Sequence, residues 1–357
     1  MEIRFEKREV LKEKPDFEHL GFGKYFTDYM FVMNYDDHHW HDARIIPYAP
    51  IHMDPASMVL HYAQETFEGL KAYKTSQGEI LLFRPEMNAR RMMNSNQRLC
   101  MPLIPEKDFV EAIEALVRIE KDWIPSKKGT SLYIRPFMFA SEAGVGVHAS
   151  ESYQFVIIAS PSASYYKNGL EPVKIYVEDD YVRAVIGGTG NVKCGGNYAS
   201  SIIAQSKAKK LGYDQVLWLD GIERKYVEEV GTMNVMFVID GSVYTAPLTG
   251  SILPGVTRDS ILHILKDQHI EVKEEKLDID FLMEAAQEGR LSEAFGCGTA
   301  ALITPIGELL YKDQSVIIND HKIGQITHLL YDTLSSIQWG DAEDIYGWTR
   351  RFKYKSA

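Results

Sequence analysis

The spacing of hydrophobic residues along the first half of the chain predicts two helices and at least two strands. Residues 85–100 begin with proline, contain no glycine and place apolar side chains roughly on one side of a helix. Residues 106–123 carry an apolar stripe at helical spacing, which predicts a second helix. Residues 131–139 and 153–159 are rich in β-branched and aromatic residues, which favours strands. This half therefore has the pattern of a mixed α/β domain.

The second half repeats this mixture. Residues 173–177 predict a strand, and residues 200–211 predict a helix that a glycine ends. Two apolar runs, 235–239 and 242–246, are separated only by an Asp-Gly dipeptide. Such a dipeptide between apolar runs is a strong local signal for a β-hairpin with a two-residue turn.

A short polar segment separates the two halves. Residues 161–172 collect serine, proline, asparagine and glycine between two predicted strands, which is typical of a linker. We therefore predict a smaller N-terminal α/β domain (1–160), an interdomain linker (161–172) and a larger C-terminal domain (173–357). A length of 357 residues agrees with two domains of ordinary size.

Composition narrows the classes of function. A net charge of −11 argues against sequence-independent binding of nucleic acid, which needs basic surface. No apolar run reaches the length of about 18 residues that a membrane span needs. The N-terminal stretch is charged throughout, unlike a signal peptide, and the three cysteines are far apart. A cytoplasmic protein is the expectation from these features.

The most distinctive polar segment, residues 187–198, surrounds Lys193 with glycines and small polar residues. Glycine allows the backbone to approach a ligand closely, and a partly desolvated lysine is a good nucleophile. The same pattern also fits a flexible loop with a solvated lysine. A phosphate-binding P-loop is excluded, because no Ser or Thr follows the lysine and the glycine spacing differs.

Four other clusters could bind charged groups, although each has an ordinary alternative. The paired carboxylates Glu228 and Glu229 fit a solvated loop, or a buried partner for a basic ring nitrogen. Residues 253–258 precede a helical pattern whose exposed N–H groups could bind an anion. Residues 296–300 predict a small-residue turn that could add further donors. Arg91 would need an anionic partner if it pointed inward, and its guanidinium geometry suits phosphate.

A histidine-rich segment, residues 36–42, has the composition of a metal site but not the spacing. Adjacent histidines on a strand or turn point in different directions, and the usual ligand spacings are not repeated elsewhere. We therefore expect no metal.

Taken together, these motifs resemble the branched-chain amino-acid aminotransferases, which are class IV enzymes of pyridoxal-phosphate fold type IV. The resemblance covers most of the chain. It is carried, in order, by Leu60-His61-Tyr62, Phe67–Tyr73, Phe83-Arg84-Pro85, Arg91-Met92, Tyr133–Pro136, Lys193–Tyr198, Gln215–Leu219, Glu229–Asn234, Leu253–Arg258 and Gly296–Ala300. The fold class that it implies is α/β (α+β), a two-domain D-amino-acid-aminotransferase-like fold.

The resemblance implies pyridoxal 5'-phosphate as the cofactor. Lys193 would form a Schiff base with it and later move the α-proton of the substrate. Glu229 would keep the pyridine nitrogen protonated, and Tyr198 would bind the phenolic oxygen. The remaining cofactor contacts, most of them to the phosphate, are expected from Arg91, the backbone of Val256 and Thr257, the hydroxyl of Thr299, and Thr232.

The substrate pocket that the resemblance implies has aromatic walls. Burial of a Leu, Ile or Val side chain against them contributes about 1.5–3 kcal/mol. Tyrosine hydroxyls and an arginine would accept the second carboxylate of glutamate, which is costly to bury without a partner. The expected residues are Tyr62, Phe67, Tyr133, Tyr165 and Thr232, with Arg135 near the rim and the N–H of Ala300 at the α-carboxylate.

The activity that the resemblance implies is reversible transfer of an amino group from L-leucine, L-isoleucine or L-valine to 2-oxoglutarate. Members of the family are homodimers or larger, and we expect the same here. The nearest alternatives share the fold: a D-amino-acid aminotransferase and an aminodeoxychorismate lyase. A non-catalytic phosphate-binding protein is an alternative from a different class, but it would need neither Lys193 nor Glu229. A nucleotide phosphotransferase lacks support because no P-loop is present.

Overall fold

The structure is a computed structural model that describes residues 1–163 and 170–352. The chain divides into two compact units, each with its own sheet. The first unit contains residues 1–167, 192–195 and 336–357, and the second contains residues 168–191 and 196–335.

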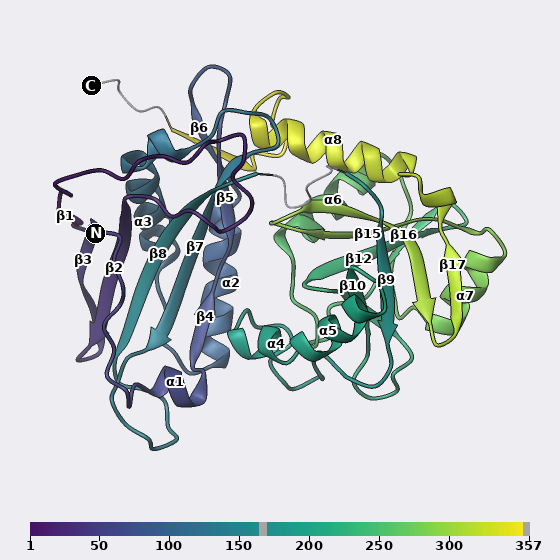
Figure 1. The fold of residues 1–357 in the computed structure, drawn as a ribbon, viewed down its shortest axis with the longest axis horizontal. Helices are drawn as coiled ribbons and strands as arrows, with labels where there is room; N and C mark the ends of the chain where they lie inside the picture. Colours follow the sequence, from purple (N-terminus) through teal and green to yellow (C-terminus); the bar gives the residue numbers. More distant parts are fainter. Residues whose placement is uncertain (164–169, 353–357) are drawn as a thin grey trace. The chain divides into compact units, whose positions relative to one another are not determined.

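The first unit is built on a nine-stranded, mainly antiparallel sheet (Figure 1). Its strand order is β1-β3-β2-β8-β7-β5-β6-β18, and β4 pairs with β7 beside β5. The strands are β1 (Arg4–Phe5), β2 (Tyr29–Asp36), β3 (His39–Pro47), β4 (Glu65–Phe67), β5 (Leu70–Lys74), β6 (Ile80–Phe83), β7 (Ser131–Ala140), β8 (Tyr153–Ser162) and β18 (Thr349–Phe352).

Two long helices of this unit, α2 (Pro85–Arg98) and α3 (Glu106–Ile119), share one core with the sheet. Both predicted helices are confirmed, although each ends earlier than expected. After α2, Cys100 has a φ of 54°, which no helix continues. After α3, the chain tightens into a 3-10 turn, η1 (Lys121–Trp123), and a short helix, α1 (Met58–Tyr62), lies elsewhere in the unit.

The sheet of the second unit closes on itself. Its order is β11-β10-β9-β16-β15-β12-β13-β14, with β17 on β16, and β11 pairs with both β10 and β12. The strands are β9 (Val173–Glu178), β10 (Gln215–Leu219), β11 (Val227–Val230), β12 (Met233–Ile239), β13 (Ser242–Thr245), β14 (Val272–Glu274), β15 (Leu291–Gly298), β16 (Leu302–Tyr311) and β17 (Gln314–Ile317). The helices are α4 (Gly195–Ala199), α5 (Ile202–Lys210), α6 (Val256–Asp267), α7 (Ile279–Gln287), the 3-10 turn η2 (Asn319–His321) and α8 (Gln325–Trp339), the last of which crosses the unit boundary.

The predicted hairpin is β12 and β13. Asp240 and Gly241 have φ of 49° and 80°, the two positive values that a type I′ turn requires. The predicted strand at 173–177 and the helix at 200–211 are β9 and α5. The predicted turn at 296–300 was partly wrong, because residues 296–298 are the end of β15. Glycine is needed there because a Cβ on Gly296 would lie 2.8 Å from Met233 Cε and from Val230 Cγ1.

The compact units do not follow chain order. The C-terminal segment from Ser336 onward belongs to the first unit, where β18 pairs antiparallel with β6. The division into domains at residues 160 and 173 stays a prediction. It did not include the C-terminal segment in the first domain. Residues 161–162 of the predicted linker continue β8, and residues 164–169 lie outside the described residues.

Within the described ranges, 1–163 and 170–352, none of the helices combines the length and the apolar character needed to cross a membrane.

We expect Gly241→Ala to lower the free energy of unfolding by about 1–2 kcal/mol, the usual cost of a left-handed backbone for an L-residue. No atom lies within 4 Å of the added Cβ, so the backbone alone would cause the loss. Urea unfolding followed by circular dichroism would measure it. Gly144→Ala is the control, because its φ is not in the positive range and its Cβ would only meet Glu142 at 3.9 Å. Equal stability of the two variants would contradict the type I′ turn.

Candidate functional site

Lys193 lies in a four-residue segment, residues 192–195, that packs as part of the first unit. Its backbone N–H donates to Ser95 Oγ at 3.1 Å, and its carbonyl accepts from the Phe67 N–H at 3.0 Å. Its ammonium Nζ lies 4.8 Å from the centre of the Phe67 ring, within the range of a cation–π contact. The side chain is half-buried rather than fully solvated. The lysine is thus held by its backbone and by an aromatic face.

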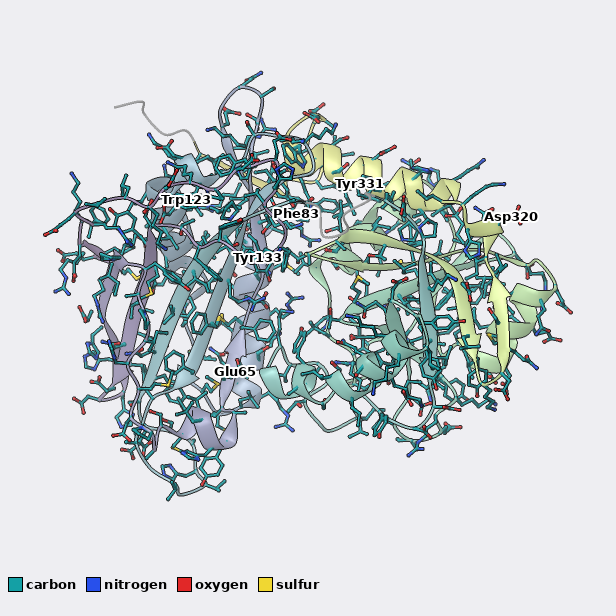
Figure 2. All side chains as sticks on the ribbon, viewed as in Figure 1. Glu65, Phe83, Trp123, Tyr133, Asp320 and Tyr331 are labelled. Carbon is teal, nitrogen blue, oxygen red and sulfur yellow. The ribbon has the colours of Figure 1, made fainter. Side chains whose placement is uncertain are left out.

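Three of the predicted substrate residues, Phe67, Tyr133 and Arg135, contact one another in the first unit. The guanidinium carbon of Arg135 lies 4.7 Å from the Phe67 ring centre, and its NH2 donates to the Tyr133 hydroxyl at 2.8 Å. Figure 2 shows Tyr133 on β7. A Cβ on Gly69 would lie 2.2 Å from that hydroxyl, so the glycine makes room for it. The result is an aromatic surface with one cation.

The other predicted residues of this pocket are placed differently. Tyr62 is exposed on α1, and its hydroxyl donates to the Val145 carbonyl. Tyr165 lies outside the described residues.

Arg91 points inward from α2, as the sequence allowed, and meets an anion of the protein itself. Its Nε and NH2 donate to the two carboxylate oxygens of Glu68 at 2.7 and 2.8 Å. Both side chains are buried. Burial opposes the charge on Glu68, but the Arg91 guanidinium outweighs it and Lys193 adds to the effect, so the pKa of Glu68 lies below its ordinary value. Asn88 Nδ2 adds a further hydrogen bond to the same carboxylate at 2.8 Å.

In the second unit, Glu229 is a buried carboxylate on β11. Its Oε1 accepts from the Leu253 N–H at 2.9 Å and from Asn234 Nδ2 at 3.4 Å. Its Oε2 lies 3.2 Å from Nε of Arg183, which is also buried. Arg183 in turn donates to the carbonyls of Gly190 and Ser251. This ion pair offsets the cost of burying the carboxylate and fixes its orientation.

The predicted phosphate-binding residues of the second unit lie at chain turns. Val256 and Thr257 are the first two residues of α6, and Gly255 at its N-cap provides no side-chain cap. Such a helix start directs N–H groups and a positive partial charge outward. Thr299 and Ala300 follow β15 and are half-buried, Tyr198 is half-buried on α4, and Thr232 is exposed between β11 and β12. Their roles stay predictions.

Two residues of the site were not assigned a role from the sequence. Glu68 was recognised only as part of a motif, and its polar sequence neighbours, such as Glu65 and Lys71, gave no signal that it is buried and paired. Arg183 was not considered at all. It stands between apolar residues just before the glycine-rich segment, which is the pattern of an arginine with a buried partner.

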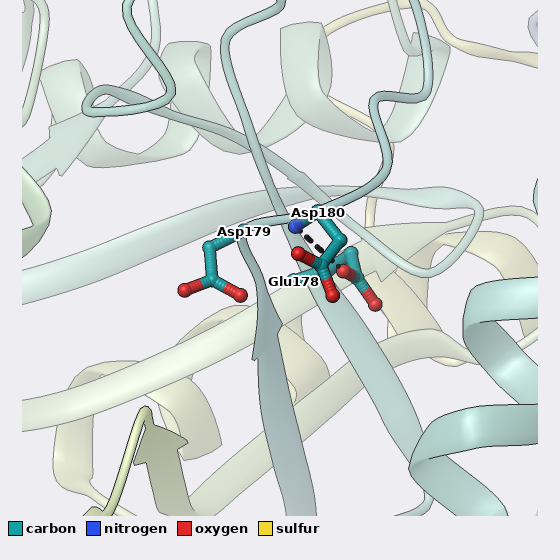
Figure 3. A group of neighbouring side chains, drawn as sticks. All are labelled: Glu178, Asp179 and Asp180. Carbon is teal, nitrogen blue, oxygen red and sulfur yellow. Dashed lines mark hydrogen bonds between the residues drawn. The ribbon is translucent and has the colours of Figure 1, made fainter.

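The histidine-rich segment does not gather metal ligands. His41 Nε2 pairs with Asp36 Oδ2 at 2.8 Å, and His38 sits in the turn between β2 and β3. Among the described residues, only Glu178, Asp179 and Asp180 bring three ligand atoms close together (Figure 3). There the Lys207 ammonium forms ion pairs with Glu178 at 3.3 Å and with Asp180 at 2.9 Å.

Comparisons with known proteins identify the family to which this chain belongs. Residues 65–309, more than half of the chain, match the family model described as amino-transferase class IV. A probable branched-chain-amino-acid aminotransferase of Staphylococcus epidermidis is 55% identical, and branched-chain-amino-acid aminotransferase 2 of Bacillus subtilis is 54% identical; each match covers 97% of this chain and 96–97% of the relative.

A solved structure agrees with these relatives. The T.th. branched-chain amino acid aminotransferase, complexed with N-(5'-phosphopyridoxyl)-L-glutamate, has a TM-score of 0.75 and 26% identity over 93% of this chain and 98% of its own. The predicted fold class, α/β with the D-amino-acid-aminotransferase-like fold, is confirmed by this similarity. The chain belongs to the class IV aminotransferases and, within them, to the branched-chain-amino-acid aminotransferases.

Proposed function

We propose that the chain transfers the amino group of L-leucine, L-isoleucine or L-valine reversibly to 2-oxoglutarate, with pyridoxal 5'-phosphate as cofactor. The observation that carries the proposal is the buried Glu229, oriented by Arg183 and two N–H donors. Anion binding alone needs no buried carboxylate, whereas a protonated ring nitrogen does. The names of the relatives and the phosphopyridoxyl-glutamate complex of the T.th. enzyme support the same reaction.

The groups present fit this cofactor. A lysine amine suits its aldehyde, a buried carboxylate suits its ring nitrogen, and a guanidinium with an uncapped helix start suits its phosphate. Because Glu68 neutralises Arg91, the charge that Arg91 offers a phosphate is smaller than that of a lone arginine. Further hydrogen bonds to the phosphate would therefore come from the N–H groups of Val256 and Thr257 and from the Thr299 hydroxyl. Tyr198 would donate to the phenolic oxygen.

When bound, the cofactor supplies an electron sink for the carbanion formed at the substrate's Cα. Lys193 Nζ would take the α-proton from one carbon and return it to another, the usual task of a positioned amine. Glu229 would hold a proton on the ring nitrogen throughout. The Phe67 face would keep the Lys193 amine in place between the two proton transfers.

Substrate selection would rest on the aromatic surface of the first unit. Phe67 and the Tyr133 ring offer apolar contact to a branched side chain, worth about 1.5–3 kcal/mol on full burial. Arg135 and the Tyr133 hydroxyl, already hydrogen-bonded to each other, would meet the second carboxylate of glutamate. Thr232 and the Ala300 N–H, the latter at the α-carboxylate, are proposed from the family resemblance alone.

The absorption spectrum of the purified protein tests this function. We expect a visible band that decreases with L-leucine, returns with 2-oxoglutarate and is unaffected by D-alanine. Lys193→Ala should lower turnover by about 100-fold to 10,000-fold, the range for loss of a positioned acid–base group. Lys209→Ala, an exposed lysine on α5, is the control.

Two other outcomes would change the assignment. A band that responds only to D-alanine would favour the D-amino-acid enzyme of the same fold. No band, even after pyridoxal phosphate is added, would sink the roles of Lys193 and Glu229 and favour a non-catalytic binding protein.

The Arg91–Glu68 pair makes a prediction about stability. Glu68→Gln leaves a buried guanidinium without its opposite charge, so the free energy of unfolding should fall by about 3–5 kcal/mol. The lowered pKa of Glu68 means that its stabilisation is present above pH 4.5 and is lost as the pH falls through the folded-state pKa. The difference between wild type and variant, measured by urea unfolding, should therefore shrink in acid.

The neighbouring arginine provides a matched control. Arg90 pairs with Glu106 at 2.7 Å on the surface, so Glu106→Gln should have a far smaller effect. If the two glutamine variants lost equal stability at neutral pH, the buried pair would not have the importance assigned to it.

We also propose a homodimer or larger homo-oligomer. Exposed apolar side chains gather where α1 meets residues 143–147 of the same unit: Met53, Leu60, Tyr62, Val145 and Val147. The two segments are joined by the Ser57–Ala143 bridge and by the Met58 N–H to the Glu142 carbonyl. Exposed apolar side chains close to one another are typical of an interface.

Light scattering after gel filtration should give at least twice the chain mass of 40.6 kDa. Val147→Asp, at a side chain that is 83% exposed, should lower the assembled fraction because it buries a charge in the interface. Ile345→Asp changes an exposed apolar residue outside this surface and is the control. A monomeric wild type, or equal masses for both variants and wild type, would contradict the proposal.

A cytoplasmic location remains part of the proposal. Its support is chemical: Cys100, Cys194 and Cys297 are all free thiols, and no disulfide joins them. Proteins of oxidising compartments more often pair their cysteines.

A further inference from the structure

The segment that carries Lys193 is held on the first unit by three hydrogen bonds. Two involve Lys193 itself, from the Phe67 N–H and to Ser95 Oγ. The third runs from the Gly195 N–H to Oε1 of Glu65. Glu65 and Phe67 are the two ends of β4, so this short strand holds the backbone that follows the Lys193 side chain, while Ser95 of α2 holds the Lys193 N–H that precedes it.

Glu65 is placed to make a strong contact. It is half-buried, and Figure 2 shows it at β4. Burial raises the pKa of Glu65, while the Gly195 N–H and the charge of Arg135 oppose that rise. A hydrogen bond to a carboxylate is stronger than one to a neutral acceptor, particularly where water is partly excluded.

Gly195 is the residue that makes this contact possible. A Cβ at this position would lie 2.4 Å from Glu65 Oε1 and 3.3 Å from its Cδ. The adjacent Gly196 is different, since a Cβ there would meet no atom within 4 Å. Neither glycine has φ in the left-handed region, so backbone freedom does not explain why Gly195 is glycine. The room for the Glu65 carboxylate does.

We propose that Glu65 is a positioning residue for Lys193, which it fixes through the Gly195 N–H. The proposal rests on the proposed function, because it assumes that Lys193 bonds to pyridoxal phosphate. Gly195 lies two residues after Lys193 in the chain, so Glu65 acts on Lys193 through the backbone between them. It needs no contact with the reacting atoms. An acceptor oxygen is what the contact requires, so glutamine can replace glutamate and alanine cannot.

The test compares Gly195→Ala, Glu65→Ala, Glu65→Gln and the double variant Glu65→Ala/Gly195→Ala. Cofactor is removed and then added back, and the rate at which the visible band appears is recorded for each protein. The kcat and KM for L-leucine are measured on the reloaded enzymes. Gly196→Ala is the matched control, and thermal unfolding shows whether each variant is folded.

Gly195→Ala should slow band formation and lower kcat by up to about 100-fold, the effect of misplacing a reacting group by about 1 Å. KM should change little, because the substrate residues are untouched. Glu65→Ala should lose less, and Glu65→Gln should restore most of the wild-type rate. The double variant should be no slower than Gly195→Ala, because removing the carboxylate gives the new Cβ room. Gly196→Ala should match wild type.

Three results would overturn the proposal. They are equal rates for Gly195→Ala and Gly196→Ala, full additivity in the double variant, and a Glu65→Gln protein as slow as Glu65→Ala. Because Glu65→Ala and Glu65→Gln create no clash, they remain informative if Gly195→Ala fails to fold. A failure of the proposed function looks different: the wild-type protein itself would then form no visible band after pyridoxal phosphate is added.

Discussion

A charged side chain that is buried away from water needs an opposite charge or N–H donors as partners. Each unit of this chain contains a buried ion pair of this kind close to residues that are proposed to act in the site. In the first unit, Glu68 joins α2 to the end of β4 through Arg91 and Asn88. In the second unit, Glu229 ties β11 to the segment before α6 through Arg183 and Leu253. Each ion pair costs free energy to bury. Each also holds one proposed cofactor-binding residue, Arg91 in the first unit and Glu229 in the second, in one orientation.

Local parts of this structure could be predicted from the sequence, because their signals act over a few residues. The Asp240-Gly241 turn depends on two backbone dihedrals, and the ends of α2 and α3 differed from prediction by only a few residues. The closure of the second sheet was missed. The sequence left open whether Glu228 and Glu229 form a solvated loop or include a buried carboxylate. Both lie in a buried strand, because each has partners brought in from elsewhere. Polar pattern alone cannot show such pairing.

The same reason explains which candidate site residues could be named from the sequence. Lys193, Arg91 and Glu229 stood out through the resemblance of ordered motifs, whereas the partner of each arginine depends on which side chains are desolvated together. Arg91 and Glu68 are 23 positions apart and come from different elements, so only the folded chain brings them together. Arg183 lies outside the glycine-rich segment and gave no comparable motif.

Several glycines in these motifs serve a purpose other than backbone freedom. Gly69, Gly195 and Gly255 have no φ in the left-handed region, yet a Cβ on each would come within 2.1–2.4 Å of a polar atom. The atoms are the Tyr133 hydroxyl, a Glu65 carboxylate oxygen and the Asn234 amide oxygen. The absent side chain therefore leaves space for a neighbour that hydrogen-bonds near the site.

The pairing of β18 with β6 sets the order in which the chain can fold during its synthesis. A domain made of one early segment can fold while translation continues. The first unit is not such a segment, because its edge strand, Thr349–Phe352, follows the whole of the second unit in the sequence. Until then β6, whose Ile80, Leu81 and Leu82 are fully buried in the finished unit, presents an unpaired edge that other chains can join. The first unit therefore completes its sheet only after residues 349–352 have been made.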